Sequence, residues 1–116
     1  MRADFPIPLA DFCADLLNLP DQIEAQEEEV LQETCALRRA KEALETREGF
    51  FIEAGEITGA NEKARSLQLR ALTVRERQQV AEAQEALDHA ACRLRTLNNR
   101  LAAYRAATRL IGGDDA

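Results

Sequence analysis

Four side chains in the second half of the sequence have the chemistry of metal ligands. Glu85, His89 and Cys92 recur at helical spacing and share one face, and Asp88 lies beside them. Imidazole, thiolate and carboxylate groups are ligands for zinc and iron. Helical di-iron sites, however, use a Glu-x-x-His spacing that is repeated on facing helices. Here the spacing is one residue longer and occurs once, so we expect a solvated helix face and neither a metal nor another cofactor.

The other residue types that support catalysis do not form a recognisable arrangement. The sequence has three cysteines, Cys13, Cys35 and Cys92. This is an odd number, and their spacing fits neither a zinc site nor a redox pair. Thiols on a helix are most often small buried side chains. Gly55-x-x-x-Gly59 lacks the Lys-Ser/Thr that completes a phosphate-binding loop. We therefore expect no enzyme activity.

Arginine and lysine side chains gather in two zones that could hold phosphate groups. One zone lies on both sides of residue 57, and the other lies near the end of the chain. A net charge of −6 opposes non-specific DNA binding, and charges on a long helix usually form a solvated face. Nucleic-acid contact is therefore the alternative prediction. Its candidate phosphate contacts are Arg38, Arg39, Arg70, Arg75, Arg77, Arg100 and Arg105.

The composition indicates which elements position these side chains. The chain has 116 residues, 46% of them hydrophobic and 4% aromatic, and 21 are alanines. Abundant Ala with Glu, Arg, Leu and Gln is typical of long helices and coiled coils, and it argues against a Rossmann-type enzyme, a β-sandwich or a disulfide scaffold. No apolar run reaches the roughly 18 residues of a membrane span. Asp4 and two prolines interrupt any signal-peptide core, so we expect a cytoplasmic protein without membrane contact.

Large apolar residues recur every seven positions in two long segments, as in helices that pack into a coiled coil. We predict an extended tail over 1–7, a helical hairpin over 8–111 and a flexible tail over 112–116. The hairpin consists of a first helix over 8–54, a turn over 55–60 and a second helix over 61–111. Pro20 interrupts this helix, yet the phase of the repeat continues beyond it. We therefore expect the first helix to be kinked or broken at Pro20 and not to reverse direction there. The expected seam is Leu9, Leu16, Ile23, Val30, Leu37, Leu44, Phe51, Val80, Leu87, Leu94, Leu97 and Leu101.

The two predicted helices have opposite charge. Segment 8–54 carries 12 acids and 4 bases, a net of −8, and segment 61–111 carries 5 acids and 10 bases, a net of +5. This difference favours an antiparallel hairpin, although each exposed pair contributes at most about 1 kcal/mol. A turn centred near Ile57 would place Leu44 near Arg70. Apolar positions outside the seam, such as Leu17 and Leu31, need further cover. We therefore expect a dimer that forms a four-helix bundle along part of its length.

The internal turn carries the most specific motif in the sequence. Gly55 can adopt the left-handed conformation that ends a helix. Asn61 or Thr58 can cap the next helix, with Glu62 in its first turn. The run Gly55-Glu56-Ile57-Thr58-Gly59-Ala60-Asn61-Glu62 resembles the Gly-Glu-Ile-x-Gly-x-Asn-Glu turn of small coiled-coil proteins of bacteriophages and related mobile elements. The resemblance extends in pattern over about residues 21–111. It implies a phage or prophage context and brings no catalytic residues.

These observations predict a non-catalytic coiled-coil interaction or scaffold protein. It would bind an unidentified protein partner or assemble with itself, as a homodimer or a larger oligomer. The residues expected at a partner-binding tip are Phe50, Ile52, Ile57, Asn61 and Glu62. The alternative is an accessory factor in DNA replication, recombination or repair that contacts nucleic acid through the basic zones.

Overall fold

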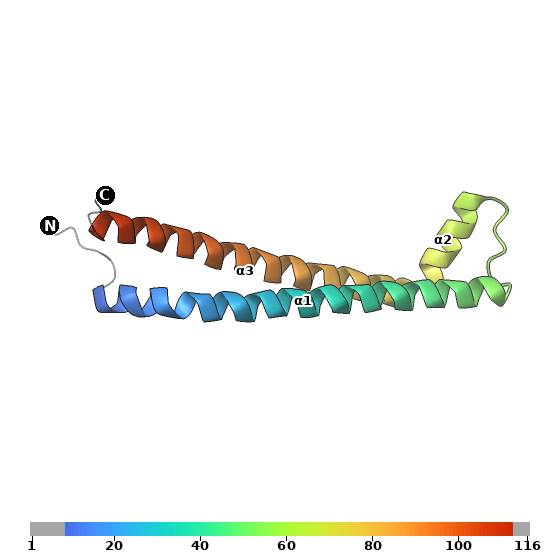
Figure 1. Cartoon of the computed structure of the whole chain (residues 1–116). Helices are drawn as coiled ribbons and strands as arrows, with labels where there is room; N and C mark the ends of the chain where they lie inside the picture. Colours follow the sequence, from blue (N-terminus) through green and yellow to red (C-terminus); the bar gives the residue numbers. More distant parts are fainter. Residues whose placement is uncertain (1–8, 113–116) are drawn as a thin grey trace. The chain divides into compact units, whose positions relative to one another are not determined.

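The computed structural model describes residues 9–112 of the chain. Within this range it contains three helices and no strand: α1 (Leu9–Glu53), α2 (Glu62–Leu72) and α3 (Val74–Gly112). α1 and α3 pack against each other as an antiparallel hairpin, which confirms the predicted all-α helical hairpin (Figure 1). Of the predicted tails, residues 1–7 and 113–116 lie outside the described residues, and Gly112 is the last residue of α3.

The chain divides into two compact units, each of which contains a part of α1 and a part of α3. The terminal unit is Met1–Val30 with Ala90–Ala116, and the loop unit is Leu31–His89. The turn and α2 belong entirely to the loop unit.

α1 runs without interruption through Pro20. The break that the sequence allowed at this position is therefore wrong, whereas a kink stays a prediction. A proline inside a helix costs about 3 kcal/mol, because it removes a hydrogen-bond donor and clashes with the preceding turn. Leu19 is 1% exposed and Ile23 is half-buried, while the proline itself is exposed. Full burial of a leucine side chain contributes about 1.5–3 kcal/mol, so packing on both sides of Pro20 offsets its cost.

In the terminal unit, α1 and α3 are joined by one aromatic contact and by polar contacts of α1 side chains. The rings of Phe12 and Tyr104 lie 4.8 Å apart between centroids. Gln26 is buried, and its side-chain amide donates a hydrogen bond to the backbone carbonyl of Ala90 at 3.0 Å. Ala90 is fully buried. Because alanine has so short a side chain, the backbone of α3 comes within reach of the glutamine.

Ion pairs between α1 and α3 are few. In the described part of the chain, Arg77 of α3 binds Glu48 of α1 at 2.6 Å, and Arg93 of α3 lies 4.0 Å from Glu29 of α1. The first pair lies in the loop unit and the second in the terminal unit. The opposite charges of the two helices therefore act mainly as a diffuse attraction, which salt weakens, and not through a ladder of contacts.

Of the predicted seam residues, all but Leu9 are buried or half-buried. Leu37 is 8% exposed, whereas Leu9 at the start of α1 is 60% exposed. The half-buried seam residues are Leu16, Ile23, Val30, Leu44, Phe51, Val80, Leu87, Leu94, Leu97 and Leu101. A second row of α1, three or four residues from the first, is also covered and was not in the predicted seam. Its members are Phe12, Leu19, Gln26, Glu33 and Ala40.

The single second helix predicted over 61–111 is wrong, because Thr73 divides it into α2 and α3. A straight helix from Arg77 back to Glu62 would run about 22 Å beyond the Glu48–Arg77 pair at 1.5 Å per residue. α1 ends at Glu53, about 8 Å beyond the same pair. About ten residues would then have had no helix to pack on, which is nearly the length of α2. α2 instead turns out of the line of α3 (Figure 1).

The same geometry changes the register that the sequence predicted for the loop unit. A turn centred at Ile57 would have placed Ser66 opposite Glu48, but Glu48 contacts Arg77. The segment between Glu48 and Arg77 includes the turn and all of α2. In a simple hairpin, residues of α2 would have paired with α1, so the residues that do pair with α1 lie further along the chain.

Candidate functional site

The end of α1 has a hydrogen-bond pattern that needs a left-handed residue. Gly55 has φ of +75°, and its backbone N–H donates to the carbonyl of Ile52 at 3.1 Å. The N–H of Glu56 donates to the carbonyl of Phe51 at 3.1 Å. These are the two bonds of a Schellman motif, and glycine adopts the required conformation without steric cost. The left-handed Gly55 that the sequence suggested is present.

The turn after α1 is held to α2 by one glutamine. The side-chain oxygen of Gln68 accepts hydrogen bonds from the N–H groups of Thr58 and Gly59, at 2.9 and 2.7 Å. Its amide nitrogen donates to the hydroxyl of Thr58 at 3.2 Å. Turn N–H groups need acceptors, and Gln68 supplies one for two of them. The turn and α2 therefore form one connected element.

The start of α2 is capped as the sequence predicted. The side-chain oxygen of Asn61 accepts from the N–H of Ala64 at 2.8 Å, which satisfies one of the free donors at a helix start. Arg65 donates to the carbonyl of Gly59 at 3.2 Å. A Cβ atom at Gly59 would lie 2.7 Å from the backbone nitrogen of Arg65. Glycine is needed here because α2 passes too close for any side chain.

Thr73 connects α2 to α3 and is fully buried. Its hydroxyl donates to the carbonyl of Leu69 at 2.6 Å and accepts a hydrogen bond from Nε of Arg77 at 3.0 Å. A second guanidinium nitrogen of Arg77 donates to Glu48 of α1 at 2.6 Å. One continuous chain of hydrogen bonds therefore joins the end of α2, the start of α3 and the side of α1.

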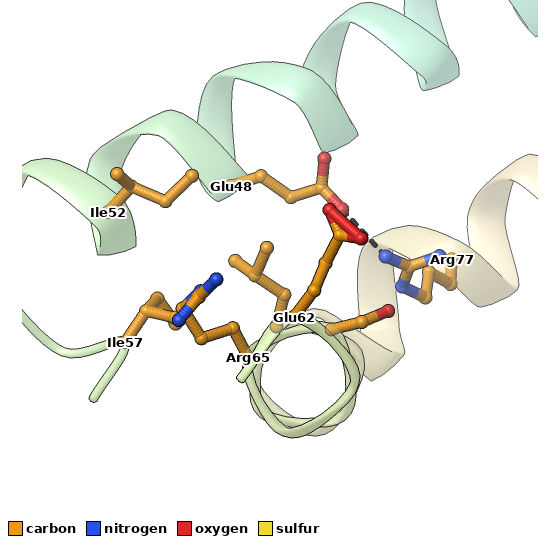
Figure 2. Close-up of a pocket in the computed structure, with 8 residues that line it drawn as sticks. Glu48, Ile52, Ile57, Glu62, Arg65 and Arg77 are labelled. Atoms are coloured by element: carbon orange, nitrogen blue, oxygen red, sulfur yellow. Dashed lines mark hydrogen bonds and ion pairs between the residues drawn. The ribbon is translucent and has the colours of Figure 1, made fainter. Parts of the chain in front are cut away.

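A groove opens between the end of α1, the turn and α2, and we call this region the elbow (residues 48–77). The groove has a volume of about 420 Å³. Its apolar lining consists of Ile52, Ile57 and Leu69. Ser66 and four charged residues complete it, namely Glu48, Glu62, Arg65 and Arg77. Figure 2 shows Ile52 and Ile57 at one end of the groove and the Glu48–Arg77 pair at the other.

Exposed apolar side chains are frequent in the elbow segment, although only Ile52 among them lines the groove. Of the ten large hydrophobic residues that are exposed in the described chain, five lie between residues 50 and 74. They are Phe50, Ile52, Leu67, Leu72 and Val74. The rings of Phe50 and Phe51 contact each other at 5.5 Å, and the guanidinium of Arg47 lies over both rings, 5.1 and 4.8 Å from their centroids. Cation–π contacts of this kind contribute about 0.5–1 kcal/mol at exposed sites.

The structure brings the predicted tip residues into one region but gives them different roles. Phe50 and Ile52 are about half exposed, at 55% and 56%, and Ile57 is half-buried in the groove. Asn61 is the helix cap, and Glu62 lies on the rim of the groove without a hydrogen bond or ion pair in the described chain.

The sequence did not predict a role at the elbow for three residues, namely Gln68, Leu69 and Thr73. The one local signal for Thr73 is the pair of β-branched residues Thr73-Val74 inside a long helical pattern. Such a pair weakens a helix only slightly. Gln68 and Leu69 fit the helical pattern of the segment and give no local signal at all.

The candidate phosphate contacts do not gather into one site. Arg77 is engaged by Glu48 and Thr73. The side chains of the other six are exposed and make no hydrogen bond or ion pair within residues 9–112. Four of them belong to the loop unit and two to the terminal unit: Arg38, Arg39, Arg70, Arg75, Arg100 and Arg105.

The potential metal-ligating residues form no candidate metal site in the described part of the chain. His89 and Cys92 are exposed, and the described residues contain no group of three or more His, Cys, Asp or Glu side chains that could hold a metal ion. The three cysteines are free, and Cys35 is half-buried while Cys13 and Cys92 are exposed. None of the described helices is long and apolar enough to cross a membrane.

Compared with protein-family models, with curated proteins and with solved structures, the chain has no match.

Proposed function

We propose that this chain is a non-catalytic helical interaction protein that assembles with a second copy of itself. The two hairpins would form a four-helix bundle along part of their length. The resemblance of the turn to phage coiled-coil proteins adds a phage context to this proposal.

The supporting observation is how little apolar surface the hairpin covers. Within residues 9–112 the buried apolar residues are Leu19, Leu37 and Ala90, while ten large hydrophobic side chains remain exposed. Two packed helices bury one face each, and most helical stability in proteins comes from packing of an apolar face. A second hairpin would cover a part of this surface.

Sedimentation equilibrium of the full chain tests this proposal. We expect a mass twice that of the chain or larger, falling toward 12.9 kDa on dilution. The melting temperature should rise with protein concentration, because association stabilises the folded state by mass action. A constant mass of 12.9 kDa over about a hundredfold range of concentration would refute self-assembly.

A second candidate function is contact with nucleic acid, which is favoured by the six exposed arginines that lack an acidic partner. Phosphate contacts release counterions, so the affinity should fall steeply with salt. Fluorescence anisotropy with single- and double-stranded oligonucleotides measures this dependence. We expect the Arg70→Ala, Arg75→Ala double variant to bind more weakly with a shallower salt slope. Failure to bind either oligonucleotide at low salt would eliminate this candidate.

A further inference from the structure

We infer that the second copy binds at the elbow, with the groove of one chain facing the groove of the other across a two-fold axis. This inference rests on the proposed self-assembly and adds its location. Three features of the elbow support it: the charge of the segment, the arrangement of charges on the rim of the groove, and the exposed apolar lining.

Charge indicates which part of the chain can meet its own copy. The elbow, residues 48–77, carries five acids and five bases, a net of zero. The stretch 24–33 of α1 instead carries five acids and no base, and the stretch 93–109 of α3 carries five arginines and no acid. In a two-fold dimer the same patch contacts itself. A two-fold axis through either of these stretches would set like charges against each other, which opposes association. An axis through the neutral elbow avoids this repulsion.

The rim of the groove carries both signs in a form that suits two-fold pairing. Glu62 and Arg65 both line the groove from α2. Glu62 makes no hydrogen bond or ion pair with the described chain, and Arg65 donates one hydrogen bond to the carbonyl of Gly59 but meets no carboxylate there. A two-fold axis through the groove would set Glu62 of each copy opposite Arg65 of the other.

The groove offers apolar surface for the centre of this contact. Ile52, Ile57 and Leu69 line it, and Ile52 is 56% exposed. A cavity of about 150 Å³ holds a benzene ring, so a groove of about 420 Å³ has room for the aliphatic side chains of a second copy. Interfaces commonly have this anatomy, with an apolar centre and a charged rim.

An Ile52→Ser variant tests the apolar centre, and Leu31→Ser is the matched control. Both residues are exposed on the α1 segment of the loop unit, Leu31 at 62%, but only Ile52 lines the groove. We expect the dissociation constant of the dimer to rise at least tenfold for Ile52→Ser and less than about threefold for Leu31→Ser, as interface centres dominate binding. Circular dichroism checks that both variants keep their helices. Equal effects of the two substitutions would overturn the elbow interface.

Charge reversal provides a second test that does not depend on packing. Glu62→Arg alone and Arg65→Glu alone should each weaken the homodimer, because each sets like charges against each other. A mixture of the two single variants should form a heterodimer with opposite charges at both contacts. We expect the mixture to associate at least tenfold more tightly than either variant alone. No gain on mixing would overturn the two-fold pairing of Glu62 with Arg65.

The two proposals fail in different ways. A chain that stays monomeric at all concentrations would refute self-assembly and the elbow interface together. A stable dimer that Ile52→Ser leaves unchanged would refute the elbow interface alone, while self-assembly through another surface would stand.

Discussion

The hydroxyl of Thr73 is predicted to hold the junction between α2 and α3, and Thr73→Val tests this with almost no change in shape. The substitution replaces the hydroxyl by a methyl group at a fully buried position. It removes the bond to the carbonyl of Leu69 at 2.6 Å and the acceptor for Arg77 Nε at 3.0 Å. The backbone N–H of Thr73 also donates to the Leu69 carbonyl, at 3.0 Å, so that carbonyl keeps one partner.

The expected loss of stability follows from these two bonds. A neutral hydrogen bond contributes about 0.5–1.5 kcal/mol and one to a charged group about 1.5–3 kcal/mol. The lower end applies to both bonds, since the Leu69 carbonyl retains a donor and the side chain of Arg77 is 35% exposed and can bind water. A buried methyl group returns about 0.8 kcal/mol. We expect a net loss of about 1.2 kcal/mol, which lowers the melting temperature by roughly 5 °C.

The chain contains its own control for this experiment. Thr96 of α3 also donates from its hydroxyl to the carbonyl four residues earlier, at 3.1 Å, but it is exposed. Thr96→Val should change stability by less than about 0.5 kcal/mol, because water replaces the lost partner. Thr73→Ser keeps the hydroxyl and should retain the stability attributed to these bonds. Thermal and urea unfolding, followed by circular dichroism at one protein concentration, measure all three variants. Equal shifts for Thr73→Val and Thr96→Val would refute the role of the junction hydroxyl.

Substitutions at Gly59, Leu37 and Gln26 probe the turn and the seam, with Gly49→Ala and Leu31→Asp as controls for the first two. Unfolding measurements under the same conditions check all five variants. Gly59→Ala should lower the free energy of unfolding by about 1–3 kcal/mol, because the added Cβ meets the backbone and Cβ of Ala64 and the backbone of Arg65 at 2.7–2.8 Å. Gly49→Ala has open space around its Cβ within α1 and should raise the free energy of unfolding by about 0.5–1 kcal/mol. Leu37→Asp buries a carboxylate in the seam and should cost about 3 kcal/mol or more, against less than about 1 kcal/mol for Leu31→Asp on the exposed side. Gln26→Glu sets a carboxylate against a backbone carbonyl and should cost about 2 kcal/mol. If Leu37→Asp and Leu31→Asp unfold at the same urea concentration, the seam is misplaced. Unchanged stability in Gln26→Glu or Gly59→Ala would contradict the contact described for that residue.

The seven-residue repeat predicted one row of the seam well and missed the other row in α1. The first row consists of large apolar residues, so hydrophobicity alone reveals it. The second row contains Gln26 and Glu33, which read as surface positions in the sequence. Gln26 is buried because fully buried Ala90 brings a backbone carbonyl of α3 within hydrogen-bond distance. Whether a polar residue is covered depends on its partner on the other helix. The residues next to it in the sequence do not reveal that partner.

The break at Thr73 could not be predicted from residues 61–111, which contain neither proline nor glycine. A continuous helix satisfies every local rule in this segment. It is the end of α1 at Glu53 that removes the surface on which such a helix would pack. Packing of Leu69 beside Ile52 and Ile57 in the groove, together with the bonds of Thr73 and Arg77, then favours the bent arrangement.

The sequence by itself determined the features that depend on neighbouring residues. These are the helical class, the heptad phase, the left-handed Gly55 and the cap at Asn61, because backbone conformation and capping act within a few residues. The tertiary structure alone decided where the second helix divides, that Gln68 binds the turn, and that Glu48 and Arg77 meet across 29 positions of the chain. These contacts join residues far apart in the sequence, so they depend on the lengths and register of packed helices and not on the residues beside them.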